Sequence, residues 1–405
     1  MSLEEHMRNP KLGNSFADED LLGRRQGHLD QELIGGHVQG KVVMVTGAAG
    51  SIGSELCRQI AGLGPLAIVG FDKAEAALIQ LGNELTRRFP YLALHAEIGN
   101  MVRLDDVTRA MGQHRPSIVF HSAAYKHVPM LETDVIAAVE NNIFGTWNVA
   151  QAAASHGVES FVLISTDKAV SPASVMGATK RVAELAIRAL NAKSNTRFVA
   201  VRLGNVLGSS GSVVPIFKEQ ITAGGPVTVT HPDMRRYFMT ASEAGQLVLH
   251  ALVMGDGGEI FVLNMGEPLG VLDMARNLIV LSGLQPGRDI RIEFIGVRPG
   301  EKLVEVLHKP DEQPIPTSHP NISNLLYSDE SNATEFTALL EDLKEAAGVQ
   351  DLLGMILLLK QMVPDYIASS QAMQHAMTHQ KDRCITDDVH APRMPSIVPM
   401  LVGSK

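Results

Sequence analysis

Three neighbouring side chains, Thr166, Asp167 and Lys168, could carry acid–base chemistry in this chain. They supply a hydroxyl, a carboxyl group and an amine, which together can add protons to one bound molecule and remove protons from it. Lys180 follows twelve residues after Lys168, whereas Met176 between them has no proton to exchange. An arbitrary Asp-Lys pair is usually a solvated ion pair on a loop. This pair directly follows an apolar run, and that position favours a functional role.

A glycine-rich turn at residues 47–53 matches the phosphate-binding turn of dinucleotide-binding proteins. The apolar run 42–45 predicts a buried strand before it, and apolar residues at three- to four-residue spacing predict a helix over 54–63 after it. The first glycine permits the tight turn, the second lets the backbone approach a phosphate, and the third lets the helix pack on the strand. The free N–H groups at the helix start would then hold a pyrophosphate.

Asp72 follows the next apolar run, 66–69, about 20 residues beyond the glycine turn. At this position a carboxylate binds the ribose hydroxyls of the adenosine half of a dinucleotide. It would also repel a 2′-phosphate, so we predict NAD as the cofactor, although the neighbouring Lys73 leaves NADP open. Asp72 can in addition cap the following helix. The strand, glycines, helix, strand and acid occur in the order that a dinucleotide site requires.

Apolar strands alternate with helical segments from residue 41 to about 308, which predicts an α/β fold with a doubly wound parallel sheet of the Rossmann type. Further strands are expected at 92–94, 117–120, 161–164 and 198–201. Ligands of such sheets bind at the carboxyl ends of the strands. We therefore expect the polar residues that follow these strands to converge on one crevice.

The composition argues against several functional classes. The 405 residues include 35 basic and 44 acidic ones, a net charge of −9, with no basic cluster interleaved with aromatic residues, so we expect no nucleic-acid partner. The two cysteines, Cys57 and Cys384, are too few for a disulfide scaffold and fit a reducing cytosol. The irregular spacing of His375, His379 and His390 predicts solvated histidines, and we expect no metal site.

No segment of the sequence is typical of a membrane span or a secretion signal. The first residues are polar, and the most apolar stretch, 352–359, is eight residues long, far below the roughly 20 residues that span a bilayer. We therefore predict a cytoplasmic protein. The last stretch, 367–405, is polar and aperiodic, so we expect it to be disordered.

From about residue 20 to 365 the chain resembles the nucleotide-sugar 4,6-dehydratases of the extended short-chain dehydrogenase/reductase superfamily. It resembles most specifically the UDP-N-acetylglucosamine 4,6-dehydratases of bacterial polysaccharide and glycan biosynthesis. Seven segments carry this resemblance: 46–53, 123–129, 142–146, 165–180, 202–211, 234–240 and 298–302. Met176 resembles the long, usually membrane-anchored branch, since the short branch has Tyr there. The opening 40 residues resemble the linker that follows the membrane helices of that branch. Two interpretations stay open: a truncated portion of such a protein, or a naturally soluble member of the branch.

The resemblance implies a reaction in three steps. NAD oxidises C4 of UDP-N-acetylglucosamine, water leaves across C5 and C6, and the hydride returns to C6, which gives UDP-2-acetamido-2,6-dideoxy-α-D-xylo-hexos-4-ulose. Asp167 would protonate the departing C6 hydroxyl, Lys168 would remove the C5 proton, and Thr166 would bind the C4 oxygen. Lys180 would bind the nicotinamide ribose. Because Met176 replaces the tyrosine, the group that takes the C4 proton stays open, with Thr166 relayed to Asp167 as first choice, and a single base predicts retention at C5.

Binding residues and a domain organisation follow. We assign to the cofactor Gly47, Gly50, Ser51, Ile52, Gly53, Asp72, Lys73, Ala123, Ala124, Asn142 and Lys180. We assign to the nucleotide sugar Lys126, Asn205, Val213, Arg236, Arg298 and Glu301. Asn142 also suits ordering of the active-site backbone, and Lys126 a structural role. The expected parts are an N-terminal arm (1–40), a Rossmann domain (41–205, completed by about 239–266), a smaller interleaved nucleotide-sugar-binding domain (206–238 and 267–308), a C-terminal helical extension (309–366) and the tail (367–405).

Two other functions stay open. A nucleotide-sugar epimerase would use the same cofactor and nucleotide site without needing the acid and base at 167 and 168. A non-enzymatic NAD-sensing protein would keep the glycine turn and lose the catalytic groups, so the intact Thr166, Asp167, Lys168 and Lys180 argue against it. For the enzyme we also expect a homo-oligomer.

Overall fold

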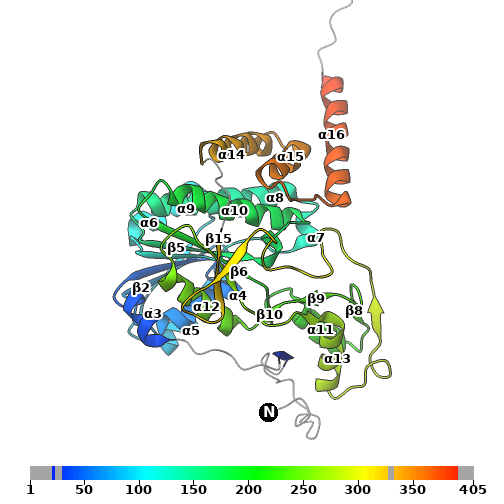
Figure 1. Ribbon diagram of the computed structural model, residues 1–405, viewed down its shortest axis with the longest axis horizontal. Coiled ribbons are helices and arrows are strands. Elements are labelled where there is room, and N and C mark those ends of the chain that lie inside the picture. Colours follow the sequence, from blue (N-terminus) through cyan, green and yellow to red (C-terminus); the bar gives the residue numbers. More distant parts are fainter. Residues whose placement is uncertain (1–20, 23–29, 327–332, 391–405) are drawn as a thin grey trace, which may run out of the picture.

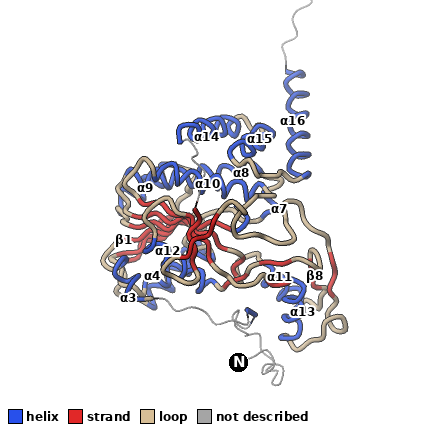
Figure 2. The backbone as a smooth tube through the Cα atoms, in the orientation of Figure 1, coloured by secondary structure: helices blue, strands red, loops and turns tan. Residues whose placement is uncertain are grey.

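The computed structural model describes residues 21–22, 30–326 and 333–390, without the side chains of 382–390. Its centre is a sheet with helices on both faces (Figure 1, Figure 2). Within the described residues this sheet has nine strands in the order β14-β15-β11-β6-β5-β4-β1-β2-β3. The parallel strands are β1 (Val42–Thr46), β2 (Ala67–Asp72), β3 (Ala93–Ile98), β4 (Ile118–His121), β5 (Ser160–Thr166), β6 (Arg197–Leu203) and β11 (Ile260–Leu263). The predicted doubly wound α/β fold is confirmed.

The central parallel strands are apolar because helices cover both faces of the sheet there, whereas the edge strand β3 is largely exposed. In β1, Val43, Met44 and Val45 are all buried. One face carries α6 (Leu104–His114), α9 (Gly145–Ser155) and α10 (Val175–Asn191). The other carries α3 (Gln31–Val38), α4 (Ser51–Ala61), α5 (Glu75–Arg88) and α12 (Ala241–Met254). The predicted strand and helix around the glycine turn therefore occupy the positions that a phosphate-binding turn needs.

A smaller unit lies beside the carboxyl edge of the sheet and is built from two separate stretches of chain. Its helices are α11 (Val213–Thr222) and α13 (Val271–Leu281), and its strand pairs are β8 (Val227–Val229) with β13 (Ile292–Phe294) and β9 (Arg235–Arg236) with β12 (Leu269–Gly270). The pair β7 (Asn205–Val206) and β10 (Phe238–Met239) joins it to the sheet. Phe217, Val227 and Leu278 belong to its own hydrophobic cluster. This is the smaller interleaved unit expected from the sequence.

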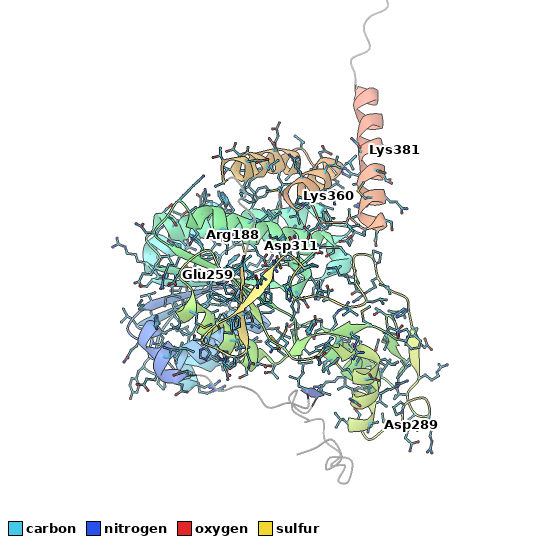
Figure 3. The ribbon with its side chains drawn as sticks, viewed as in Figure 1. Arg188, Glu259, Asp289, Asp311, Lys360 and Lys381 are labelled. Carbon is cyan, nitrogen blue, oxygen red and sulfur yellow. The ribbon has the colours of Figure 1, made fainter. Side chains whose placement is uncertain are left out.

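The chain after residue 333 forms α14 (Ala333–Gly348), α15 (Leu352–Met362) and α16 (Ser370–His390). The first two pack on α8 (Val135–Val139) and α10, and α16 projects away from the body of the molecule (Figure 1). Lys360, labelled in Figure 3, donates to the backbone oxygens of Pro364 and Tyr366 at 2.7 and 2.6 Å and so holds the segment after α15.

Three segments differ from the sequence-based expectation. The predicted helical extension begins with an antiparallel hairpin, β14 (Gln313–Pro316) and β15 (Ile322–Leu326), which adds to the sheet beside β11. The predicted disordered tail begins with α16, because Ala372 and Ala376 pack into the cluster under Tyr366. The end of the N-terminal arm forms α3, whose buried Ile34 and Val38 join the main core. Residues 391–405 and most of the arm lie outside the described residues.

Among the described helices, none combines the length and the apolar character needed to cross a bilayer. In the same part of the chain, no cluster of three or more His, Cys, Asp or Glu side chains could hold a metal ion. Cys57 is a buried free thiol whose pKa burial raises to about 12, whereas the side chains of Cys384 and His390 lie outside the description.

Candidate active site

The glycine turn between β1 and α4 is built so tightly that side chains are excluded. Gly47 has φ +67°, and a Cβ there would stand 2.6 Å from the backbone nitrogen of Ala123. A Cβ at Gly53 would stand only 2.1 Å from the Gly47 oxygen, while Gly50 is less constrained, at 3.2 Å from the same oxygen. The turn and the loop after β4 therefore lie in contact, as a cofactor spanning both strands would require.

Asp72 closes the glycine turn from the neighbouring strand. Its carboxylate accepts the backbone N–H of Ala49 and that of Ala74, each at 2.9 Å. The acid thus supports the glycine turn and the segment before α5, but the N-cap residue of α5 is Ala74 and not Asp72, as the sequence had suggested. The Nζ of Lys73 reaches the hydroxyl of Tyr125 and lies 4.2 Å from the centre of that ring.

A cavity of about 160 Å³ opens between these elements. It is lined by residues of the turn, of the β2, β3 and β4 ends and of the helix that follows: Gly47, Gly50, Phe71, Asp72, Lys73, Gly99, Asn100, Met101, Ser122, Ala123, Ala124, Tyr125 and Asn141. Six of the residues assigned to the cofactor from sequence line this cavity: Gly47, Gly50, Asp72, Lys73, Ala123 and Ala124. Ser51 and Ile52 are not among the lining residues: the Oγ of Ser51 accepts the backbone N–H of Ser210 at 3.2 Å, and Ile52 packs against the main hydrophobic core.

Thr166, Asp167 and Lys168 form one hydrogen-bonded group at the end of β5. Asp167 is fully buried, and its Oδ1 accepts the Thr166 hydroxyl at 2.9 Å and the Lys168 Nζ at 3.0 Å. Lys168 also donates to the Oδ1 of Asn205 at 3.2 Å, on the next strand end. The second oxygen of Asp167, Oδ2, is buried without a hydrogen-bond partner among the described residues. One oxygen of Asp167 is therefore held by its neighbours, and the other is buried without a partner in the described part of the chain.

Helix α10 supplies the second half of the group. Lys180 is 4% exposed and donates to the backbone oxygen of Ile164 at 2.8 Å. Burial lowers the pKa of Lys180 to about 8, although the carboxylate of Glu184 acts to raise it. Met176 is buried in the hydrophobic cluster that includes Val128 and Leu131. A packed apolar side chain therefore occupies the position at which the short branch has Tyr.

Both the oxygen and the nitrogen of the Asn142 side-chain amide form hydrogen bonds within the protein. Its Oδ1 accepts the backbone N–H of Tyr125 at 2.8 Å, and its Nδ2 donates to the Tyr125 oxygen at 3.0 Å and to Thr179 at 3.1 Å. The side chain lies in the π-turn Glu140–Phe144 and is fully buried. These contacts favour the ordering of active-site backbone over direct cofactor binding.

The residues assigned to the nucleotide sugar fall into two places. Lys126, whose pKa burial lowers, donates to Ser209 at 3.3 Å, and Val213 begins α11 a few residues later. Asn205 lies beside Lys168, as described above. A Cβ at Gly211 would stand 2.6 Å from the ring of His127, so the loop 208–212 packs closely on the segment around Lys126.

The two arginines have different partners. Arg236 is nearly buried and donates to the backbone oxygens of Arg235 and Leu303 at 2.8 and 3.0 Å. Arg298 is half exposed and pairs with Glu301 at 2.6 Å. The structure thus ties the segment 298–305 to β9, but it gives Arg236 and Arg298 separate surroundings.

Comparison with known proteins bears on the family. Residues 43–326 match the family model described as "Polysaccharide biosynthesis protein". The chain belongs to this family. Over 295 residues it is 52% identical to the probable polysaccharide biosynthesis protein EpsC of Bacillus subtilis (strain 168), which covers 73% of this chain and 49% of EpsC. The chain therefore spans about half the length of that curated relative.

Solved structures share the fold. The structure of Pen from Bacillus thuringiensis is 34% identical with a TM-score of 0.67, covering 73% of this chain and 90% of Pen. DesIV, a dTDP-glucose 4,6-dehydratase of Streptomyces venezuelae solved with NAD, is 21% identical with a TM-score of 0.59, covering 66% and 88% of the two chains. The second likeness bears on the fold alone. Both support the Rossmann-type fold of the extended short-chain dehydrogenases.

The sequence did not predict a buried network of charged side chains around Arg202. Arg202 is fully buried and pairs with Glu184 at 2.9 Å and with Glu312 at 2.8 Å. Glu184 also accepts the Ser165 hydroxyl at 2.6 Å and pairs with Arg181 at 2.9 Å. Burial acts to raise the pKa of Glu184, but the flanking arginines, Arg202 foremost, lower it to about 2. The network joins β5, β6 and α10 directly beneath the acid and base.

Glu305 was also missed. It is buried beside Lys302, 3.8 Å away, and Arg236, 4.0 Å away. The pattern Lys302-x-x-Glu305, following Arg298-Pro-Gly-Glu, was visible in the sequence. Nothing in its spacing indicated that the chain returns there to the end of β5.

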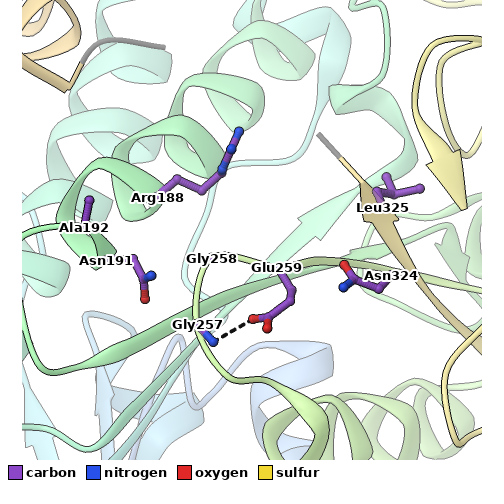
Figure 4. A pocket seen from close by; sticks show the side chains of 8 residues that line it. All are labelled: Arg188, Asn191, Ala192, Gly257, Gly258, Glu259, Asn324 and Leu325. Carbon is purple, nitrogen blue, oxygen red and sulfur yellow. Dashed lines mark hydrogen bonds between the residues drawn. The ribbon is translucent and has the colours of Figure 1, made fainter. Parts of the chain in front are cut away.

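A second cavity, of about 330 Å³, lies at the opposite edge of the sheet. Figure 4 shows it between α10, which contributes Arg188 and Asn191, and β15, which contributes Asn324. Asn191 accepts the backbone N–H of Phe198 at 3.0 Å, so this cavity lies by the amino end of β6. It is separate from the acid and base, which follow the carboxyl end of β5.

Proposed function

We propose that this chain is an NAD-dependent nucleotide-sugar 4,6-dehydratase that acts on UDP-N-acetylglucosamine in polysaccharide biosynthesis. The observation that carries the proposal is the contact between Lys168 and Asp167 at 3.0 Å, at the carboxyl end of a central strand. An elimination needs a base at one carbon and an acid at the neighbouring oxygen, and these two side chains stand next to each other. An epimerase has no need of such a pair.

The residues present fit NAD. The glycine turn is tightly packed, because a Cβ at Gly53 or Gly47 would collide with the backbone, and its Gly47 and Gly50 line the cavity that would hold the pyrophosphate. The carboxylate of Asp72 faces the same cavity and is suited to ribose hydroxyls. Bound there, NAD supplies a hydride acceptor that returns the hydride at the end, so it is regenerated in each turnover. Lys180 would hold the nicotinamide ribose.

Asp167 and Lys168 carry the elimination in this proposal. Lys168 removes the C5 proton, which oxidation at C4 makes acidic, and Asp167 protonates the C6 hydroxyl as water leaves. Their hydrogen bond keeps the base and the acid together. Lys168 is neutral before C4 is oxidised, and Asp167 gives the C6 hydroxyl the proton that it takes from the C4 hydroxyl, so the protons balance. The unpartnered Oδ2 of Asp167 is the oxygen available to the leaving group. A site without water favours the neutral pair.

Thr166 handles the C4 oxygen in this proposal. Its hydroxyl already donates to Asp167 at 2.9 Å, so the proton of the C4 hydroxyl can pass through Thr166 to the Asp167 carboxylate. Met176 cannot take that proton and is held in a hydrophobic cluster. The diphosphate of the substrate would be bound by Arg236, Arg298 and Asn205. The rest of the nucleotide sugar would contact Lys126, Val213 and Glu301.

NMR of the purified protein with UDP-N-acetylglucosamine in heavy water tests the proposal. A 4-keto-6-deoxy sugar with deuterium at C5 and a C6 hydride that came from C4 supports it. A C4 epimer that keeps its C6 hydroxyl would establish an epimerase instead. No turnover of any nucleotide sugar, together with tight NAD binding, would favour a non-enzymatic NAD-binding protein.

The stereochemistry at C5 is a finer part of the same proposal. A single base, Lys168, removes the C5 proton, and no opposing acid was assigned, so the proton returns to the same face. Early product should therefore have the D-xylo configuration. If early product shows the inverted C5 coupling pattern before any epimerisation in solution, the prediction of retention at C5 is wrong. The proposed dehydratase function would still stand.

A further inference from the structure

The carboxylate of Glu305 is buried between two cations. Glu305 is 3% exposed, its Oε1 lies 4.0 Å from the Nη2 of Arg236, and its Oε2 lies 3.8 Å from the Nζ of Lys302. Oε2 has no hydrogen-bond partner within the described part of the chain. Neither cation is as close as a hydrogen-bonded ion pair, so the carboxylate is only loosely neutralised.

Backbone contacts join Glu305 to the catalytic turn. The Nζ of Lys302 donates to the oxygen of Val170 at 2.8 Å, and the N–H of Val170 donates to the oxygen of Asp167 at 3.2 Å. On the other side, Arg236 donates to the Leu303 oxygen at 3.0 Å. The segment 302–305 therefore lies between the acid–base pair and the arginine that we assign to the substrate diphosphate.

Four charged groups face Glu305. Lys168 and Asp167 come from the end of β5, Arg236 comes from β9, and Lys302 comes from its own segment. Burial raises the pKa of Glu305; Lys168 lowers it, Asp167 raises it, and Arg236 and Lys302 lower it in turn. Burial likewise lowers the pKa of Lys302. Two carboxyl groups thus share one poorly hydrated region with three cations.

We propose that Glu305 is a positioning residue that couples diphosphate binding at Arg236 to the protonation of the Asp167–Lys168 pair. The inference rests on the proposed dehydratase function. The negative charge of Glu305 disfavours a second negative charge on Asp167 and so favours the acid in its proton-bearing form. When a diphosphate binds Arg236, it partly neutralises the positive charge of the arginine, which then screens Glu305 less. The repulsion between Glu305 and a negatively charged Asp167 therefore increases. Substrate binding therefore favours the protonated form of Asp167.

The pH dependence of kcat in Glu305→Gln tests the coupling. Asp167 and Lys168 share a hydrogen bond, so the two limbs of the kcat–pH bell should belong to the pair. Removing one nearby negative charge should move the whole bell to lower pH by roughly 0.5 to 1 unit. We expect kcat at neutral pH to fall by roughly 10-fold, with a smaller change in KM.

Three further variants separate charge from shape. Glu305→Asp keeps the charge and should restore the position of the bell. Glu305→Met removes the charge without burying a new amide, and it replaces Glu305→Gln if that variant does not fold. Glu293→Gln removes an exposed carboxylate of the same unit, 3.9 Å from Arg291, and should leave the bell in place.

The outcomes distinguish the two proposals. If wild type forms no 4-keto-6-deoxy product from UDP-N-acetylglucosamine, the dehydratase function fails and this inference fails with it. If wild type is active and neither Glu305→Gln nor Glu305→Met moves the bell, the coupling is wrong and the dehydratase proposal stands. A fall in rate without a shift of the bell would assign Glu305 a purely structural role.

Discussion

Gly177, in the first turn of α10, lies directly against the backbone carbonyl of Lys168. A Cβ at position 177 would stand 2.3 Å from that oxygen and 3.2 Å from the Cβ of Pro172. The helix that carries Lys180 and the turn that carries the acid and base are therefore in backbone contact. Their relative position does not depend on flexible side chains.

Gly177→Ala should separate this helix from the catalytic turn. Because the contact is with backbone, the turn or the helix must shift, and a displacement of about 1 Å can cost on the order of 10²-fold in turnover. We expect such a loss with the fold and NAD binding retained. Gly82→Ala in α5 is the matched control, since a Cβ there would lie 3.9 Å from Leu94, and it should leave activity unchanged. Equal activity of both variants would show that the close contact is unimportant.

Asp167→Asn and Lys168→Met should each lower turnover by roughly 10² to 10⁴, the range for loss of one general acid or base. Both replacements are close in size to the native side chains, so affinity for the nucleotide sugar should be largely kept. Steady-state kinetics and calorimetry with UDP-N-acetylglucosamine measure the two effects. Lys41→Met, which breaks an ion pair with Glu159, serves as the control. Near wild-type turnover in either catalytic variant would remove its assigned role.

The buried Lys180 should make stability depend on pH in a defined direction. Burial lowers its pKa from 10.5 to about 8, so between these values the unfolded chain binds more protons than the folded one. Stability then rises with pH, and the cost of the buried charge is fully present below about pH 8. Relative to Lys180→Met, wild type should gain about 2 kcal/mol in unfolding free energy between roughly pH 7.5 and 9.5. Urea titrations at both pH values check this, and a constant difference would contradict it.

Arg202→Met should destabilise the protein by about 3–5 kcal/mol, because it leaves Glu184 and Glu312 buried without their shared cation. Arg58→Met is the comparison, since its ion pair with Glu84 is partly exposed and should be worth about 1 kcal/mol or less. Denaturant unfolding measures both. If the two losses are similar, the buried network contributes little to stability.

The purified protein should bind NAD in preference to NADP, because the carboxylate of Asp72 faces the cavity that would hold the adenosine ribose. Asp72→Asn should narrow this preference, although its single amide oxygen keeps only one of the two hydrogen bonds that the carboxylate accepts from the backbone of Ala49 and Ala74. Calorimetry with both cofactors is the measurement. Tighter binding of NADP by wild type would shift the assignment to Lys73.

Local features of the sequence were sufficient for the sheet and the glycine turn. An apolar β-branched run such as 42–45 is stable only as a strand buried on both faces, and a glycine turn between such a strand and a helix has few structural solutions. The same is true of the acid and base, which are adjacent in sequence and follow β5 directly. These expectations concern neighbours along the chain, where spacing alone sets geometry.

Contacts between distant segments were decided by the tertiary structure. Glu305 and Glu312 reach the end of β5 and Arg202 only because the chain returns there after the smaller unit, more than a hundred residues later. The hairpin β14–β15 is a strand pair because β11 offers an open edge, and α16 is a helix where Ala372 and Ala376 find a surface to pack on. Burial of charge in particular depends on what surrounds a side chain in space. Residue type and local spacing are therefore insufficient to predict it.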